Sequence, residues 1–114
     1  MSRKLRTDEI ALISFLLEGA ELEDILTPYL DSFLVEDMND GGMGSLRFLY
    51  DCKHPYGGVI VEAEYVDLDG VMVLISLIRT KKNQLYELDV FKGDFSPLNR
   101  FPRASQILNK RIFN

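Results

Sequence analysis

The stretch from residue 59 to residue 91 carries three successive strand patterns separated by tight turns, and it restricts the fold more than any other feature. Within residues 59–67, Val61, Ala63 and Tyr65 alternate with Glu62 and Glu64, which is typical of a strand with one buried face. Asp69-Gly70 then supplies a hairpin turn, and residues 80–83 supply another. Strands joined by such short connections pair with their sequence neighbours, so we expect an antiparallel sheet.

Residues 71–79, the middle pattern, are apolar at both alternating positions. Such a strand belongs at the centre of a sheet, covered on both faces, or covered on one face with a dimer contact on the other. Residues 84–91 follow as a further strand. Its alternation places Tyr86, Leu88 and Val90 on one side and Leu85, Glu87, Asp89 and Phe91 on the other.

The first thirty residues have a helical period. Thr7 is suited to cap a helix that ends near Gly19, and a second short helix follows over residues 21–30, interrupted or restarted at Pro28. Residues 33–38 and 45–50 then read as two strands around a glycine-rich turn. The sequence therefore predicts an α+β fold, with two N-terminal helices packed on an antiparallel meander of about five strands.

The length of 114 residues indicates one domain over residues 1–114. Residues 1–6 and 103–114 are expected to be flexible or peripheral, with a short helix over residues 103–112. Both ends are basic, whereas residues 7–99 hold 18 acidic and 6 basic residues, a net charge of −12. The ends either fray in solvent or bind the acidic body of their own chain or of a neighbouring copy.

The acidic body also indicates the class of partner. It repels nucleic acid phosphates and favours a basic protein, so we expect no nucleic acid partner. Cys52 is the single cysteine, which fits a reducing compartment, and we expect a cytoplasmic protein without a membrane span.

Four carboxylates form the main candidate site. The alternation places Glu62, Glu64, Glu87 and Asp89 on one face of the sheet, with one strand between the two pairs. The pairs are then about 10 Å apart, too far for one metal ion. A solvated or salt-bridged face and a partner-binding face are the two main interpretations, and we name no catalytic residue, metal ligand or cofactor.

A second candidate is the loop formed by Asp40, Gly41, Gly42 and Met43. Its backbone amides would suit an anion, but it lacks the Lys-Ser/Thr ending of a phosphate loop, so a hairpin turn is the preferred interpretation. Asp67-Leu68-Asp69-Gly70 contains only a fragment of a calcium loop and is interpreted as a turn. Cys52 and His54 lack the orienting group that a nucleophilic pair needs. In residues 94–98, Asp94 or Ser96 is expected to cap a turn while Phe95 and Leu98 pack on the core.

Three stretches carry a resemblance to a known family: LRTDEI at residues 5–10, DGGMGSL at residues 40–46 and ELDVFKGDFSPL at residues 87–98. They resemble a family of small, mostly bacterial proteins described only as a domain of unknown function. The likeness extends to about Phe101-Pro102. It implies one domain and brings no activity or catalytic residue.

Two function hypotheses follow. The first is a non-enzymatic protein-interaction module that binds a basic protein or a second copy of itself. Its acidic, compact character is similar to that of small immunity proteins that neutralise basic toxins. The alternative is a small-ligand- or metal-binding protein, with or without enzymatic activity, that uses the four-carboxylate face or the Gly41-Gly42 loop.

Overall fold

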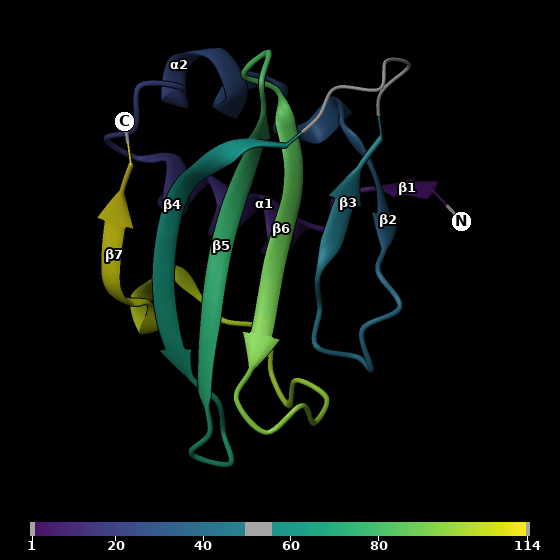
Figure 1. The fold of residues 1–114 in the computed structure, drawn as a ribbon, viewed down its shortest axis with the longest axis vertical. Coiled ribbons are helices and arrows are strands. Elements are labelled where there is room, and N and C mark those ends of the chain that lie inside the picture. The colour runs from purple at the N-terminus through teal and green to yellow at the C-terminus, as the bar shows by residue number, and fades with distance from the viewer. Residues whose placement is uncertain (1, 50–55, 114) are drawn as a thin grey trace.

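The structure is a computed structural model that describes residues 2–49 and 56–113. Within these residues, seven strands form one antiparallel sheet in the order β1-β2-β3-β6-β5-β4-β7. Figure 1 shows the helix α1 (Thr7–Leu17) crossing behind the sheet, and the N- and C-terminal ends at opposite edges. The α+β class and the antiparallel sheet are therefore confirmed.

The three longest strands are β4 (Tyr56–Val66), β5 (Met72–Thr80) and β6 (Leu85–Lys92), and they lie side by side. The predicted turn between β4 and β5 is closed by a hydrogen bond from Gly70 N to Asp67 O (2.9 Å). The turn between β5 and β6 is closed from Thr80 N to Gln84 O (2.8 Å). Both short turns hold neighbouring strands in register, as the alternation predicts.

The strand count of five is wrong, and so is the single meander. β1 (Ser2–Lys4), β2 (Leu34–Asp37) and β3 (Leu46–Phe48) form a second antiparallel group, with the helical segments between β1 and β2 in the chain, and it joins the first because β3 pairs with β6. β1 is only three residues long, too short for alternation to reveal it.

The helical segments also need correction. The chain begins with β1 rather than with a helix, and the N-cap of α1 is Arg6, one residue before the expected Thr7. The second helix is present as α2 (Glu23–Leu26) followed by the 3-10 helix η1 (Thr27–Ser32), with Pro28 in the first turn of η1. The cap at Gly19 is confirmed, since its φ is +86° directly after the C-cap Glu18.

The helix expected over residues 103–112 is wrong. A 3-10 turn, η2 (Ala104–Gln106), leads into β7 (Leu108–Ile112), which pairs with the outer edge of β4. Backbone pairing with β4 outweighs the local helical preference of this segment. Both predicted peripheral ends thus contain edge strands, β1 and β7.

The core lies between α1 and one face of the sheet. Residues that α1 buries completely pack against apolar side chains from β2 to β6. The main members are Leu12, Ile13, Leu16, Leu17, Val35, Leu46, Val61, Ala63, Val73, Ile75, Leu77, Leu88 and Val90. The opposite side of the sheet, which we call the open face, keeps Met72 and Leu74 of β5 exposed. β5 is therefore central but covered on one face only along this part of its length.

Candidate functional site

The two glycine- and proline-containing loops, residues 40–45 and 93–98, lie against each other. Leu98 N donates to Gly42 O (3.0 Å), and Lys92 N donates to the sulfur of Met43 (3.3 Å). Gly42 has φ +84°, and a Cβ there would come within 3.3 Å of Pro97. The stretches DGGMGSL and ELDVFKGDFSPL thus pack directly against each other.

Asp40 organises the first loop from within. Its carboxylate accepts hydrogen bonds from Met43 N (3.1 Å) and Ser45 N (3.0 Å). These two amides, which an anion would need, are therefore already engaged by the chain itself. The arrangement matches the turn interpretation of Asp40, Gly41, Gly42 and Met43.

Ser45 fastens this loop to β6 and was not singled out from the sequence. Its hydroxyl accepts a hydrogen bond from Val90 N (2.9 Å) and donates to Val90 O (3.2 Å). Ser45 is buried, so these bonds are shielded from water. The hydroxyl continues the pairing of β3 and β6 beyond Leu46.

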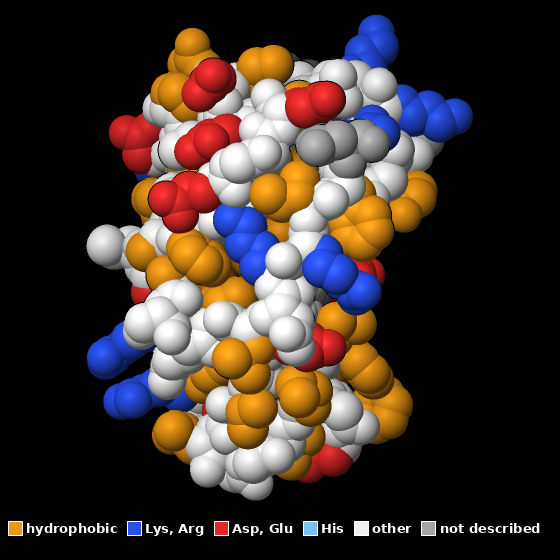
Figure 2. Space-filling model, turned by 90° about the vertical axis from the view of Figure 1, so that its left-hand side faces the viewer, with side chains coloured by type: hydrophobic (Ala, Val, Ile, Leu, Met, Phe, Trp, Pro, Cys, Tyr) orange, Lys and Arg blue, Asp and Glu red, His pale blue; other side chains and the backbone are white. Residues whose placement is uncertain are grey.

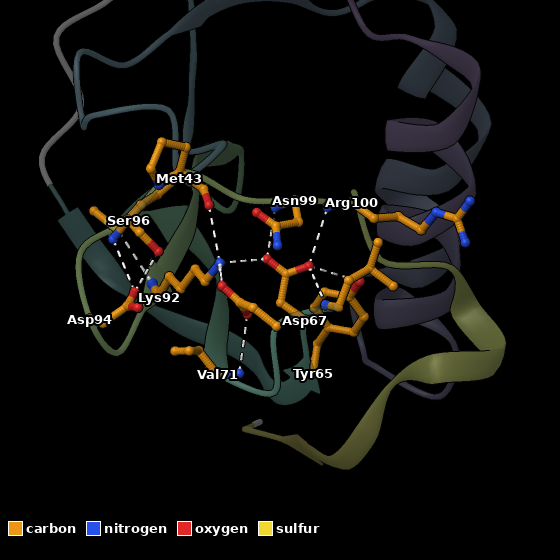
Figure 3. A network of polar contacts seen from close by, with 12 residues as sticks. Met43, Tyr65, Asp67, Val71, Lys92, Asp94, Ser96, Asn99 and Arg100 are labelled. Carbon is orange, nitrogen blue, oxygen red and sulfur yellow. Dashed lines mark hydrogen bonds and ion pairs between the residues drawn. The ribbon is translucent and has the colours of Figure 1, made fainter.

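Lys92 lies at the centre of the network, with its side chain fully buried. Its ammonium group donates to Asp67 (2.9 Å), to Asp69 (2.6 Å) and to the carbonyl of Pro97 (3.1 Å). All three donors of the ammonium are thus used. Figure 3 shows this side chain extending from β6 toward the carboxylates of the β4–β5 turn.

Asp67 is equally buried and joins the turn to the segment after Pro97. Its carboxylate accepts from Leu68 N (2.8 Å), Asn99 N (2.7 Å) and Arg100 N (3.2 Å) in addition to Lys92. The pair Asp67 and Asp69, which suggested a fragment of a calcium loop, therefore binds a lysine ammonium. The sequence signals for this contact are an acid pair at a hairpin turn and a lysine that continues the alternate apolar positions of Leu88 and Val90.

The pKa values follow from these contacts. Burial acts to raise the pKa of Asp67, but the Asn99 N–H, the Lys92 ammonium and the Leu68 N–H lower it to about 2. Burial acts to lower the pKa of Lys92, but its hydrogen bonds to Asp69 and Asp67 outweigh this and raise it. Both groups are therefore charged at neutral pH, and the buried ammonium is neither a free nucleophile nor a proton acceptor.

The four predicted carboxylates share the open face. Register places Glu62 opposite Ser76, and Ser76 opposite Asp89, so their side chains emerge on the same side. Glu64 and Glu87 lie two residues from these acids on the same strands. The carboxylates spread across the face and take separate partners, which are Arg111 for Glu62 (2.9 Å), Asn109 for Glu64 (2.6 Å), Arg47 for Glu87 (3.3 Å) and Ser45 for Asp89 (3.4 Å).

An apolar patch continues this face toward the β4–β5 turn. Val66 lies opposite Met72, and Leu74 lies opposite Phe91, so the four side chains are neighbours on two adjacent strand pairs. Phe95 stacks edge-on against Phe91 at 5.2 Å between ring centroids. We call these five side chains, all exposed, the apolar strip.

Phe95 corrects the expectation that it packs on the core. It is 69% exposed and has φ +64°, which turns it onto the open face. The expected cap is confirmed, because Asp94 accepts from Ser96 N (3.0 Å). Leu98 packs against the core as predicted.

Two predicted residues and two kinds of site complete the comparison with the sequence. Cys52 and His54 lie outside the described residues. Across residues 2–49 and 56–113, no group of three or more His, Cys, Asp or Glu side chains converges to hold a metal ion. Within the same ranges, no helix is both long and apolar enough to span a bilayer.

Comparison with known proteins gives one match. Residues 2–102 match the model of a family described as a domain of unknown function, DUF6984. No curated protein and no solved structure matches the chain. The match includes both loops and the Lys92–Asp67 contact, and it ends before β7.

Proposed function

This chain belongs to the DUF6984 family of unknown function, and we propose that it is a non-enzymatic protein-interaction module that binds a basic protein partner on its open face. The observation that carries the proposal is the apolar strip of Val66, Met72, Leu74, Phe91 and Phe95 beside the four carboxylates. Exposed apolar side chains that gather on one surface and are bordered by polar groups are typical of interaction sites.

The apolar strip is suited to a protein surface rather than to a small molecule. Its side chains come from three adjacent strands and the loop after β6, so a partner can cover them together. Phe95 and Phe91 present a paired aromatic contact, the residue type enriched at the centres of interfaces. The proposed partner therefore supplies apolar side chains opposite the strip.

Charge supports a basic partner. The open face carries Glu62, Glu64, Glu87 and Asp89, and the body of residues 7–99 has a net charge of −12. A field of one sign raises the association rate with a partner of opposite sign. An immunity-like role in the cytoplasm, in which the partner is a basic toxin, is one form of this proposal.

The ligand- or metal-binding alternative is placed second. The four carboxylates spread over β4 and β6 and are engaged by Arg111, Asn109, Arg47 and Ser45 instead of converging on one point. A metal site needs several ligands within about 2.0–2.6 Å of one ion.

A photo-crosslinking residue at position 95 tests the proposal in cells that naturally contain the protein. The matched control carries the same residue at Tyr29, an exposed aromatic position on η1. We expect adducts with a basic protein from position 95 that are absent from position 29 and that disappear when Leu74→Asp is added. Identical adducts from both positions, or adducts that survive Leu74→Asp, would contradict the proposal.

Light scattering completes the test. An adduct with twice the mass of the chain, together with a dimer in solution that Leu74→Asp dissociates, would assign the apolar strip to self-association instead of a basic partner.

A further inference from the structure

The outer edge of β4 is covered by a strand that lies outside the family match. β7 pairs antiparallel with β4, with Glu62 opposite Arg111 and Glu64 opposite Leu108, while Phe113 N donates to Ile60 O (2.7 Å). β4 has 11 residues and β7 has 5. Figure 1 shows β7 at the end of the sheet, joined to the rest by one connection. β7 therefore covers only part of a long strand edge.

The side chains of β7 match this edge by charge. Arg111 pairs with Glu62 (2.9 Å), and Asn109 donates to Glu64 (2.6 Å). Figure 2 views this side of the molecule, where Lys and Arg side chains lie among carboxylates and apolar groups. The basic strand thus neutralises part of the acidic open face.

Lys110 adds a contact with the end of α1. Its ammonium donates to Phe15 O (2.6 Å) and Glu18 O (2.8 Å) and lies 4.7 Å from the centroid of the Phe15 ring. The last turn of α1 contains no basic residue of its own. A cation at this position is favoured because helix C-terminal carbonyls carry partial negative charge.

β7 is nevertheless held less firmly than the inner strands. Asn109 has φ +52°, and the register with β4 shifts between Glu62 and Glu64. Asparagine tolerates left-handed backbone, so this φ marks a local break in regular strand geometry. The side chain of Arg111 is 66% exposed, and Leu108 and Phe113 are also exposed. Exposed ion pairs of this kind contribute little to stability, and Ile112 is the residue of β7 that packs against the core.

A hollow of about 180 Å³ lies where β7 ends. It is lined by Leu22, Val59, Ile60 and Phe113 together with the polar side chains of Glu21, Arg79 and Asn83. Val59 and Ile60 belong to β4, next to the last residues that β7 contacts. A longer strand running along β4 would extend over this hollow and bury more surface than β7 does.

We propose that the β4 edge is a strand-docking site, occupied in the free protein by β7, and that an extended basic segment of a partner protein binds there by displacing β7. Addition of a strand to a sheet edge supplies backbone hydrogen bonds, and alternate side chains supply specificity. The preferred segment has basic residues at the positions of Lys110 and Arg111 and apolar residues at those of Leu108 and Ile112. This edge is separate from the apolar strip, although Glu62 and Glu64 belong both to the edge and to the open face, and either site can exist without the other.

The test locks and unlocks β7 in the full chain. Cysteines replace Glu64 and Leu108, which lie opposite each other, so that Glu62 stays available to the peptide, and Cys52→Ser leaves this pair as the only thiols. The probe is a fluorescent peptide with the sequence of residues 103–114. We expect the reduced protein to bind it and the oxidised protein to bind at least tenfold more weakly. The same preparation in two redox states is its own control.

A second variant does not depend on the disulfide. Arg111→Glu sets two acids opposite each other, which loosens β7, so the peptide should bind several-fold more tightly than to the unaltered chain. A peptide with Glu in place of both Lys110 and Arg111 should fail to bind.

Two results would overturn the proposal. One is peptide binding that is equal for locked, unaltered and Arg111→Glu protein, or absent from all three. The other is a dimer of Arg111→Glu protein that excludes the peptide, which would make a second copy the occupant.

Discussion

The ammonium of Lys92 lies 2.9 Å from the carboxylate of Asp67, and both side chains are completely buried. The pair connects β6 to the β4–β5 turn, and Asp67 extends the connection to the backbone of Asn99 and Arg100. A buried ion pair with all its hydrogen bonds made contributes mainly through what its loss leaves behind, an unpaired buried charge.

Asp67→Ala should therefore destabilise the protein by roughly 3–5 kcal/mol, because Lys92 loses a buried partner and the three backbone amides of Leu68, Asn99 and Arg100 lose their acceptor. Urea unfolding at pH 7 measures the change. Asp69→Ala is the control and should cost clearly less, since the Asp69 side chain is 35% exposed. A double variant, Asp67→Leu with Lys92→Met, should be more stable than Asp67→Ala; equal stability would argue against an unpaired charge as the cause.

The carboxylate of Asp67 should also make the stability of the protein depend on pH. Its pKa falls from 3.8 to about 2 on folding, so the unfolded chain binds more protons between these values. Stability is then fully present above about pH 4 and falls as the pH drops toward 2. Asp37 and Asp94, whose pKa values are also lowered, contribute in the same direction.

Thermal unfolding of Asp67→Asn between pH 2 and pH 5 should give a flatter profile than that of the unaltered protein. Asp94→Asn should retain most of the slope because its carboxylate caps an exposed turn. An unchanged slope in Asp67→Asn would show that other carboxylates cause the acid sensitivity.

Gly42→Ala should destabilise the contact between the two loops. Gly42 has φ +84°, and an added Cβ would lie 3.3 Å from Pro97. Gly70→Ala is a matched control, because Gly70 has φ +79° and open space around the same position. In both variants the left-handed backbone lowers the free energy of unfolding by about 1 kcal/mol. The additional loss in Gly42→Ala, measured by urea unfolding, therefore reports the contact with Pro97.

Glu9→Gln should loosen β1. The buried carboxylate of Glu9 accepts hydrogen bonds from the guanidinium of Arg3 (2.8 Å) and from Arg6 N (2.7 Å), and Arg3 also binds Asp37. Loss of the charge weakens a charge-assisted contact, with an expected cost of about 1–3 kcal/mol. Hydrogen exchange should become faster in residues 2–4 and 34–37 while β5 stays protected. Asp8→Asn, at an exposed acid in the same turn, should leave exchange unchanged.

Local patterns predicted the central strands well because their alternation is long and their turns contain Asp-Gly or polar residues. The shared face of Glu62, Glu64, Glu87 and Asp89 followed from the same period. β1 was missed because three residues cannot show a period, and β7 was missed because Leu108–Ile112 becomes a strand by pairing with β4. Pairing with distant parts of the chain determines these two strands, and such pairing cannot be predicted from the local pattern of one sequence.

The buried network shows a similar division. Asp94 was predicted as a turn cap, and the turn at Asp69-Gly70 was predicted correctly. The contact between Lys92 and Asp67 joins residues 25 positions apart, so local spacing could not predict this pairing. Phe95 was assigned to the core by its hydrophobicity, whereas its left-handed backbone turns it outward onto Phe91.

The two edge strands share a property that bears on solubility. Arg3 and Lys4 lie in β1, and Lys110 and Arg111 lie in β7, so each edge strand of the sheet carries two basic residues. Arg3 and Arg111 are paired with carboxylates of their own chain. Two copies that approached edge to edge would bring like charges together while their backbones tried to pair. Charged edge strands are a known protection against the growth of sheets from one molecule to the next. Basic residues in both edge strands of an acidic chain thus disfavour edge-to-edge pairing of two copies.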